Sequence, residues 1–281
     1  MTALSPDALP GVPGARVRQV RALPRVLKGA TRCTAWAQAR QGVLLYDIPG
    51  LARMRISDGS LVEICPAEEG QEALIAQYLQ GTARAVLVHQ RGGLPLHAAC
   101  LVPPGGSDAI ALAGVSGAGK STLAAELLRR GWTLLGDDVT PLYRVGDEVL
   151  AWPSKPGVKL WNDACDALSI AADDLSKVPG ERDKYVFPAP TRAEPARLAS
   201  VLLLAWGGPN GFNPMGGSAL LAALTEATFK PHYVTAMGCA GSFLHMASFV
   251  ATRVPCGIVT SSGSVGERAD MIEGVWAGSI G

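Results

Sequence analysis

A glycine-rich stretch near the middle of the chain constrains the fold more than any other feature. Residues 114–122 read Gly-Val-Ser-Gly-Ala-Gly-Lys-Ser-Thr and match the pattern G-x-x-x-x-G-K-[ST] in full. Residues 109–113 before it are apolar and predict a buried strand, and residues 123–130 after it are rich in helix formers and end at Gly131. This order of strand, glycine loop and helix predicts a loop that binds phosphate groups at a helix N-terminus.

Each part of this loop has a role in holding a nucleoside triphosphate together with Mg²⁺. Glycines at 117 and 119 let the backbone turn its N–H groups inward. The Lys120 amine can reach the β- and γ-phosphates of ATP, and the Ser121 hydroxyl can ligate Mg²⁺. The alternative is a glycine-rich turn that matches the pattern by chance. The expected ATP-binding residues are Gly114, Ser116, Gly117, Ala118, Gly119, Lys120, Ser121 and Thr122.

Composition narrows the class of protein. Hydrophobic residues make up 48% and charged residues 17%, which is typical of a globular chain. The net charge of +1 gives no reason to expect nucleic acid or an anionic membrane as a partner. No apolar run approaches the roughly 18 residues that span a bilayer, and residues 1–15 lack the apolar segment of a secretory signal. We expect a cytoplasmic protein, and a homo-oligomer is left open.

The chain is expected to have three parts. Residues 1–27 contain prolines that interrupt any periodic pattern, and they predict a flexible basic arm. No acidic residue occurs between Asp7 and Asp47, so this arm is either a docking surface for an acidic peptide or a solvated segment. Residues 28–92 are expected to form a small α+β domain, and residues 93–281 the catalytic domain that contains the glycine loop.

Hydrophobic periodicity and turn residues predict helices and strands in both domains. The expected strands are 43–46, 52–56, 61–64, 96–102, 109–113, 132–136, 141–145, 149–152, 156–161, 184–187, 198–206 and 256–260. The expected helices are 68–79, 83–89, 123–130, a short one ending at 168, 219–228 and 236–250. Residues 173–183 and 207–217 are expected to be loops. This alternation of strands and helices predicts an α/β fold.

Two adjacent carboxylates, Asp137 and Asp138, follow the strand expected at 132–136. The chain from Lys120 to Asp137 is long enough for one helix, a turn and a return strand beside the first, so both aspartates should face the glycine loop. One can hold Mg²⁺ and the other can accept a proton from an attacking hydroxyl, because neighbouring strand residues point to opposite faces. The alternative is a surface turn in which both cap the next segment.

One histidine and two basic residues are further candidates for the site. His97 lies on the strand expected just before the glycine loop, where it is either a satisfied core residue or a catalytic one. Arg182 and Lys184 lie near the start of the strand expected at 184–187, and they are candidates for a rim that faces the phosphates.

Three segments together resemble the catalytic domain of bacterial HPr kinase/phosphorylase. Residues 96–99, 114–121 and 134–139 occur in the same order and at similar spacing as the matching elements of that family. A looser likeness over most of the chain, with motifs at 159–161 and 184–185, is to kinase-like relatives of the family. Some of these relatives are lasso-peptide precursor kinases, which phosphorylate a serine. The family fold is similar to the nucleotide-binding core of phosphoenolpyruvate carboxykinase.

The resemblance implies a fold and a role for each site residue. The fold would be α/β, with a P-loop nucleotide-binding core similar to HPr kinase and phosphoenolpyruvate carboxykinase and a small N-terminal α+β part. Asp138 would be the general base, and His97 would lie near the transferred phosphate. Asp137 would support the metal and His97. The loop pattern itself adds Ser121 as a metal ligand and Lys120 as a catalytic residue.

These features together predict an ATP-dependent kinase that uses Mg²⁺. It would transfer the γ-phosphoryl group to a serine hydroxyl of a protein or peptide, for which a ribosomally made peptide precursor is one candidate. A kinase for a small hydroxylated metabolite is one alternative. A nucleotide-gated binding protein without transfer activity is another.

Overall fold

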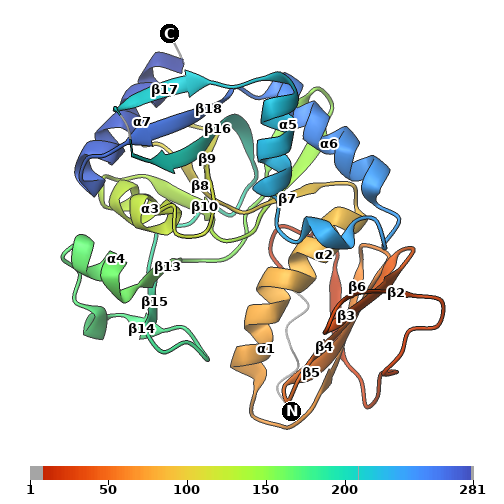
Figure 1. Ribbon diagram of the computed structural model, residues 1–281. Coiled ribbons are helices and arrows are strands. Elements are labelled where there is room, and N and C mark those ends of the chain that lie inside the picture. The colour runs from red at the N-terminus through yellow and green to blue at the C-terminus, as the bar shows by residue number, and fades with distance from the viewer. Residues whose placement is uncertain (1–8, 208, 280–281) are drawn as a thin grey trace.

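The N-terminal third of the chain forms a sheet with one helical segment packed against it (Figure 1). The computed structural model describes residues 9–207 and 209–279. The sheet has six strands in the spatial order β1, β6, β5, β4, β3 and β2. Their bounds are β1 (Arg16–Gln19), β2 (Thr31–Thr34), β3 (Ala37–Arg40), β4 (Val43–Ile48), β5 (Ala52–Ser57) and β6 (Leu61–Pro66). The helical segment consists of α1 (Glu72–Tyr78), a π-helical turn (Leu79–Ala83) and α2 (Arg84–Gln90).

The three strands expected between residues 43 and 64 are confirmed as β4, β5 and β6. In β5, Ala52, Met54 and Ile56 are buried and alternate with half-buried residues, which is the period of a strand with one face on the core. The buried faces of these strands join α2 and the second sheet in one hydrophobic cluster. The division between a domain at 28–92 and a domain at 93–281 stays a prediction.

Residues 9–27 include a strand and several buried side chains, whereas a flexible arm was expected over residues 1–27. Strand β1 pairs in parallel with β6, and Leu9 and Val12 are buried. Prolines prevent a helix here, but a strand of four residues needs only an open sheet edge with unpaired backbone groups. Residues 1–8 lie outside the described residues.

An ion-pair cluster centred on Glu63 joins β1 to the rest of this sheet. Glu63 is only 3% exposed, and its carboxylate accepts hydrogen bonds from Arg18 of β1 and Arg55 of β5. Burial acts to raise the pKa of Glu63, but the two arginines outweigh it and hold the pKa below its usual 4.5. The charged form of Glu63 therefore stabilises the folded state.

Glu63→Gln should lower the free energy of unfolding at pH 7 by about 2 kcal/mol, because two arginines lose their carboxylate. The folded-state pKa of Glu63 lies below the unfolded value, so this contribution is present above pH 4.5 and is lost as the pH falls through the folded pKa. Urea denaturation at pH 7 and in acid should show the difference shrinking on acidification. Glu148→Gln, at an exposed position, is the control and should change little; a pH-independent effect at Glu63 would contradict the ion-pair account.

A nine-stranded sheet organises the rest of the chain. Its spatial order is β10, β8, β9, β16, β12, β11 and β7, with β18 also beside β16 and β17 beside β18. The bounds are β7 (Leu94–Leu96), β8 (Ala98–Val102), β9 (Ala109–Ala113), β10 (Thr133–Gly136), β11 (Thr140–Val145), β12 (Glu148–Ala151), β16 (Ala196–Trp206), β17 (Gly211–Pro214) and β18 (Cys256–Ser261). Strands β9, β16 and β18 are parallel, so their carboxyl ends meet at one edge.

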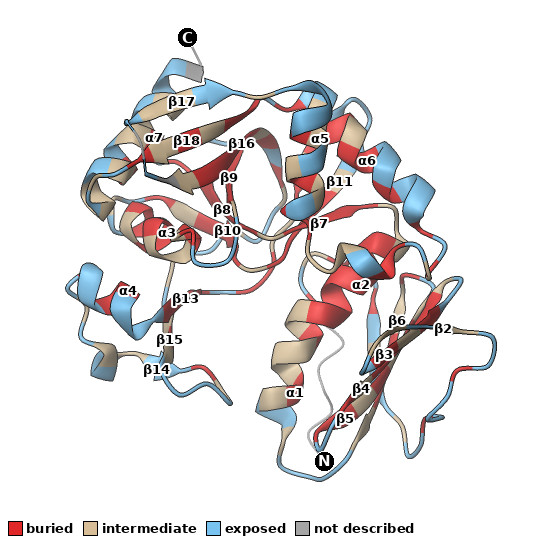
Figure 2. Cartoon of the chain, viewed as in Figure 1, coloured by how far each residue is buried: buried red, intermediate tan, exposed pale blue. Residues whose placement is uncertain are grey.

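Helices cover both faces of this sheet (Figure 1). In β9, Ile110 and Leu112 pack into the cluster that contains α3 (Lys120–Arg129) and α7 (Val265–Ser279). The alternate residues of β9 pack into the cluster that contains α5 (Gly217–Glu226) and α6 (Ala240–Arg253). Figure 2 shows the resulting layer of buried strands between exposed helix faces. The chain is therefore a mixed α/β protein with several sheets, as expected in outline.

A small three-stranded sheet lies beside α3, below it in Figure 1. It consists of β13 (Val158–Trp161), β14 (Ser176–Lys177) and β15 (Lys184–Phe187), with α4 (Asn162–Ala167) inserted after β13 and a 3₁₀ turn at Ala172–Asp174. A second 3₁₀ turn at Pro231–Tyr233 lies between α5 and α6. Leu160 and Tyr185 of the small sheet are buried in the same cluster as α3, so this sheet is fixed against the helix that follows the glycine loop.

Several local features differ from the sequence predictions, including strands β2 and β3, which were not expected, and β14 inside the loop expected at 173–183. The strand expected at 96–102 is broken at His97, because β7 pairs with β11 while β8 pairs with β9. Strand β10 was expected directly beside β9, but it pairs with β8 instead. Strand β17 forms inside the loop expected at 207–217, and α7 was not expected, since its glycines and charges leave no clear apolar stripe.

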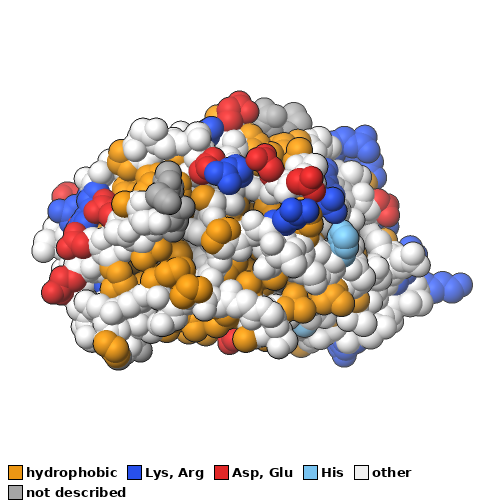
Figure 3. All heavy atoms as spheres, turned by 90° about the horizontal axis from the view of Figure 1, so that it is seen from above, with side chains coloured by type: hydrophobic (Ala, Val, Ile, Leu, Met, Phe, Trp, Pro, Cys, Tyr) orange, Lys and Arg blue, Asp and Glu red, His pale blue; other side chains and the backbone are white. Residues whose placement is uncertain are grey.

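Charged side chains are mixed on the face shown in Figure 3, where acidic and basic groups lie next to each other along the upper edge between hydrophobic areas. Among the described residues, no helix is both long enough and apolar enough to cross a membrane.

Candidate active site

The glycine-rich loop joins the carboxyl end of β9 to the first turn of α3. Gly117 and Gly119 have φ angles of 82° and 69°, in the left-handed region that the sequence analysis required of them. Gly119 is the N-cap of α3, and no side chain makes a capping hydrogen bond to this helix. The backbone N–H groups of its first turn are therefore left for the loop and a ligand. The Lys120 amine donates hydrogen bonds to the carbonyls of Gly114 and Val115, at 2.8 and 2.9 Å. The amine therefore lies at the beginning of the loop.

A pocket opens above this loop, and we call it the loop pocket. Its lining includes Ser116, Gly117, Gly119, Lys120, Ser121 and Thr122 from the expected ATP-binding set. It also includes His97, Asp138, Lys159, Leu160, Trp161, Asp163, Ala164 and Lys184. Gly114 lines a separate apolar pocket beside α5. Ala118 is 3% exposed, and its backbone N–H donates to the Val115 carbonyl, so it shapes the loop from within.

Asp137 connects three elements beneath the loop pocket. Its side chain is buried, and Oδ1 accepts a hydrogen bond from the Ser121 hydroxyl of α3 at 3.4 Å. Oδ2 accepts from the backbone N–H of Lys159 in β13 at 3.2 Å. Burial, and after it the nearby charge of Asp138, raises the pKa of Asp137. The serine hydroxyl and the Asp137 carboxylate are therefore fixed beside each other, as a metal site at this position requires.

The donor set at this position fits Mg²⁺ that is shared with a substrate. Among the described residues there is no group of three or more His, Cys, Asp and Glu side chains placed to hold a metal ion. Mg²⁺ is usually held by one or two carboxylates together with phosphate oxygens and water, so a site made only of protein ligands is not needed. Ser121 and Asp137 supply one hydroxyl and one carboxylate, both hard oxygen donors, directly beside the glycine loop.

A tight backbone turn separates the two aspartates. Asp138 has a φ of 69°, rare for a residue with a side chain, and the Val139 N–H donates to the Asp137 carbonyl at 2.9 Å. The turn reverses the chain, so that Asp137 lies in the interior while the Asp138 side chain is 34% exposed and lines the loop pocket. Local backbone strain of this kind concentrates at functional sites. The two carboxylates therefore lie in different environments, while the separate roles expected for them stay a prediction.

Asp138 is held by two lysines, Lys155 and Lys159, whose amines each lie 3.1 Å from its Oδ2. Burial acts to raise the pKa of Asp138, but these two cations outweigh it and hold the pKa well below the usual value. Burial lowers the pKa of Lys155 to about 8, against the opposing charges of Asp138 and Asp137. The sequence analysis did not assign a role to either lysine. In the sequence the two lysines are four residues apart, with a proline between them, in an otherwise largely apolar segment. This pattern is the signal that could have pointed to them.

The segment that carries Lys155 is also held from the N-terminal part of the chain. Arg84 of α2 is fully buried and donates to the Ser154 carbonyl at 3.4 Å. Burial lowers the pKa of Arg84 to about 10, and the charge of Asp138 opposes this shift. Ser154 in turn accepts a hydrogen bond from the Asp137 N–H at 3.2 Å. A side chain from residues 28–92 thus supports the aspartate turn.

His97 lies at the break between β7 and β8, where it reaches the loop pocket. Its backbone N–H donates to the Ala227 carbonyl at 2.7 Å, and its ring packs edge-on against Phe229 at 5.7 Å. Burial, and after it the charge of Lys120, lowers the pKa of His97 below its usual value. At neutral pH the imidazole is therefore uncharged, so one ring nitrogen can donate a hydrogen bond and the other can accept one.

Of the two basic residues expected on the rim, Lys184 lines the loop pocket. Its amine lies 4.5 Å from the centre of the Trp161 ring, a cation–π arrangement across β15 and β13. Arg182 is exposed in the segment before β15 and is not among the residues that line the loop pocket. Trp161 is 50% exposed, which leaves a large ring at the mouth of the pocket. The sequence analysis did not assign it a role.

Gly136→Ala should lower stability and weaken Mg·ATP binding. A Cβ at position 136 would collide with Ser154 Oγ and come within 3.2 Å of Thr140 Oγ1, so it displaces the hydroxyl that accepts from Asp137. Overpacking of this kind costs about 1–3 kcal/mol. Thermal unfolding and calorimetric titration would measure the two effects. Gly241→Ala, at a helical position with free space for a Cβ, should lower neither stability nor affinity; an equal loss in the two variants would contradict the close approach.

Comparisons with known proteins give distant likenesses to solved structures. No protein-family model matches the chain, and no curated protein matches it. Among solved structures, the chain is similar to the HPr(Ser) kinase/phosphatase from Coxiella burnetii, with a TM-score of 0.35 and 11% sequence identity. The match covers 66% of this chain and 97% of that chain. At this TM-score and identity, the likeness carries no argument about function.

Proposed function

We propose that this chain is an ATP- and Mg²⁺-dependent kinase that transfers the γ-phosphoryl group to a serine hydroxyl of a protein or peptide. One observation carries the proposal: residues from separate segments of the chain converge on the loop pocket or lie directly beneath it. Lys120 and Ser121 come from α3, Asp137 and Asp138 follow β10, and His97 separates β7 from β8. Lysines from β13 and β15 complete the pocket.

The loop and α3 would bind the triphosphate. The first turn of α3 offers backbone N–H groups and partial positive charge, and the Lys120 amine can exchange its two carbonyl partners for phosphate oxygens. Ser121 and Asp137 would hold Mg²⁺, which supplies neutralising charge at the phosphates when bound. In phosphoryl transfer, positioning and charge stabilisation supply most of the rate enhancement.

Asp138 would accept the proton of the attacking hydroxyl. Its carboxylate lines the loop pocket, and the ion pairs with Lys155 and Lys159 fix its direction. These pairs also make it a weak base, which suffices because the transition state of phosphoryl transfer is loose and the hydroxyl loses its proton late. Neutral His97 can orient the hydroxyl or a γ-phosphate oxygen by a hydrogen bond.

The choice of acceptor rests on the resemblance of residues 96–99, 114–121 and 134–139 to HPr kinase/phosphorylase. Incubation with Mg·ATP and serine-containing peptides, followed by phosphopeptide mass spectrometry, tests it. A phosphoserine product supports the proposal. Transfer only to small hydroxylated compounds would make the chain a metabolite kinase. ATP binding without transfer to any acceptor would make it a nucleotide-gated binding protein.

A further inference from the structure

A second hollow continues the loop pocket on the side of α3, and we call it the α4–α7 cleft. It shares Gly117, Gly119, Thr122, Asp163 and Ala164 with the loop pocket, so the two form one continuous trough. Beyond the shared residues, its walls are Leu123 of α3, Ala167 of α4, and Val265 and Arg268 of α7. The cleft thus lies between three helices, with the glycine loop at one end.

The position of the Lys120 amine fixes the direction in which a triphosphate lies on the loop. The amine is bonded to the carbonyls of Gly114 and Val115, at the beginning of the loop. In loops of this pattern the lysine reaches the β- and γ-phosphates, and the backbone cradles the α- and β-phosphates. The α-phosphate therefore lies toward Gly119 and Thr122, and the nucleoside continues from there.

We propose that the α4–α7 cleft binds the ribose and base of the nucleoside triphosphate. The inference rests on the proposed function, in that the glycine loop must hold the phosphates. Leu123, Ala164 and Val265 give the cleft apolar walls suited to a planar base. Asp163 lines both the cleft and the loop pocket, and its carboxylate can accept hydrogen bonds from ribose hydroxyls.

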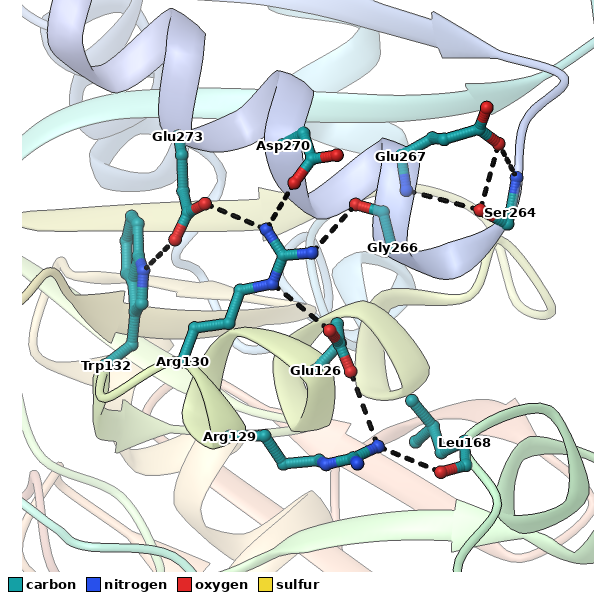
Figure 4. Close-up of polar contacts among 10 residues, drawn as sticks. All are labelled: Glu126, Arg129, Arg130, Trp132, Leu168, Ser264, Gly266, Glu267, Asp270 and Glu273. Carbon is teal, nitrogen blue, oxygen red and sulfur yellow. Dashed lines mark hydrogen bonds and ion pairs between the residues drawn. The ribbon is translucent and has the colours of Figure 1, made fainter.

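An ion-pair cluster centred on Arg130 fixes α7 relative to the helix that follows the loop (Figure 4). The Arg130 guanidinium of the α3 C-terminus donates to Asp270 at 2.6 Å and Glu273 at 2.8 Å. It also donates to the Gly266 carbonyl at 3.0 Å, in the first turn of α7. The wall made by α7 is therefore held at a set distance from the glycine loop.

The beginning of α7 is fixed independently by a capping box (Figure 4). The Ser264 N–H donates to Glu267 Oε2 at 2.7 Å, and the Glu267 N–H donates back to Ser264 Oγ at 3.3 Å. Val265 and Arg268 extend from this turn into the cleft. The cleft is consequently formed before any ligand enters, which reduces the ordering cost of binding.

The apolar pocket beside α5 does not fit the base. It is lined by Gly114 and Val115, the residues whose carbonyls hold the Lys120 amine. A base placed there would join the triphosphate at its γ end, which reverses the direction set by the lysine.

Ala167→Trp tests the proposal, because Ala167 is exposed on α4 and a larger side chain would fill the cleft without entering the core. Calorimetry should show the Kd for Mg·ATP rising about tenfold or more. The Kd for Mg·tripolyphosphate, which has no base or ribose, should stay unchanged. Ala222→Trp, at another exposed helical alanine, is the matched control and should leave both affinities unchanged.

An unchanged ATP affinity in Ala167→Trp, or an equal loss for ATP and tripolyphosphate, would overturn the proposal. Wild-type protein that binds tripolyphosphate as tightly as ATP would overturn it too, while leaving phosphate binding by the loop intact. Wild-type protein that binds neither ligand would instead refute the proposed function. If melting curves show that Ala167→Trp does not fold, Val265→Phe narrows the cleft from the opposite wall and should give the same selective loss.

Discussion

Replacing Lys120 with alanine should abolish phosphoryl transfer and weaken Mg·ATP binding. The amine lies at the beginning of the loop and is the cation that can follow the β- and γ-phosphates into the transition state. A charge-assisted hydrogen bond contributes about 1.5–3 kcal/mol, so the Kd for Mg·ATP should rise roughly 10- to 100-fold. Calorimetry gives the affinity, and a labelled-phosphate assay gives the transfer rate.

The fold should survive this change. Burial lowers the pKa of Lys120, with Asp137 and Asp138 opposing it, and in the absence of ligand its amine bonds only to loop carbonyls. Circular dichroism should therefore show a near-native spectrum. Lys28→Ala removes an exposed lysine outside the site and should leave binding and transfer unchanged. Full activity in Lys120→Ala would refute the proposed site as a whole.

The parts of the site that are local in sequence could be predicted. The glycine loop, the strand before it and the helix after it occupy one continuous stretch, and the left-handed φ angles of Gly117 and Gly119 follow from the residue type. Asp137 was found because a strand of ordinary length returns the chain to the loop. Strand β10 lies beyond β8, but it runs in the same direction as β9, so β9 and β10 end at the same edge and Asp137 still reaches the loop.

The partners of Asp138 could not be predicted, because they depend on tertiary structure. Lys155 follows β12 and Lys159 lies in β13, and tertiary packing, including that of β13 against α3, brings them to Asp138. The left-handed backbone conformation of Asp138 could not be predicted from the sequence either, since aspartate adopts it only when its surroundings require it. Sequence patterns identify the residues that can do chemistry, whereas the groups that tune them come from distant segments.

The two ends of the chain were harder to predict for another reason. Strand β1 has no periodic pattern of its own and forms because the edge of β6 is available. Helix α7 is rich in glycine and charge, and it is stabilised by the Arg130 cluster and by burial of Ala269 and Ile272. Tertiary contacts outweigh weak intrinsic propensity in both cases.

Asp138→Asn should keep Mg·ATP binding and lose most turnover. The amide is nearly isosteric with the carboxylate, so the loop pocket keeps its shape, but it cannot accept the proton of the attacking hydroxyl. General-base catalysis contributes about 10²- to 10⁴-fold, so transfer should fall by at least about 100-fold. Single-turnover kinetics with saturating Mg·ATP would measure the chemical step, and calorimetry would measure affinity.

The lysines beside Asp138 add two expectations for this variant, one for stability and one for triphosphate affinity. In Asp138→Asn, Lys155 and Lys159 lose the carboxylate that neutralises them, and Lys155 is only 8% exposed. Stability should fall, because a buried cation is left without a partner. The affinity for the triphosphate anion should at the same time stay equal or rise, since uncompensated positive charge near the loop attracts it.

Asp137→Asn is the matched variant. It should weaken Mg²⁺-dependent ATP binding, which Asp138→Asn is expected to keep. Asp137 contacts the Ser121 hydroxyl and is proposed to hold Mg²⁺, so its loss should raise the Mg²⁺ concentration needed for ATP binding. If Asp138→Asn instead abolished Mg²⁺-dependent ATP binding while Asp137→Asn kept it, the roles would be reversed and Asp137 would be the proton acceptor. Because one residue is interior and the other lines the pocket, the two variants cannot give the same result under the proposed roles.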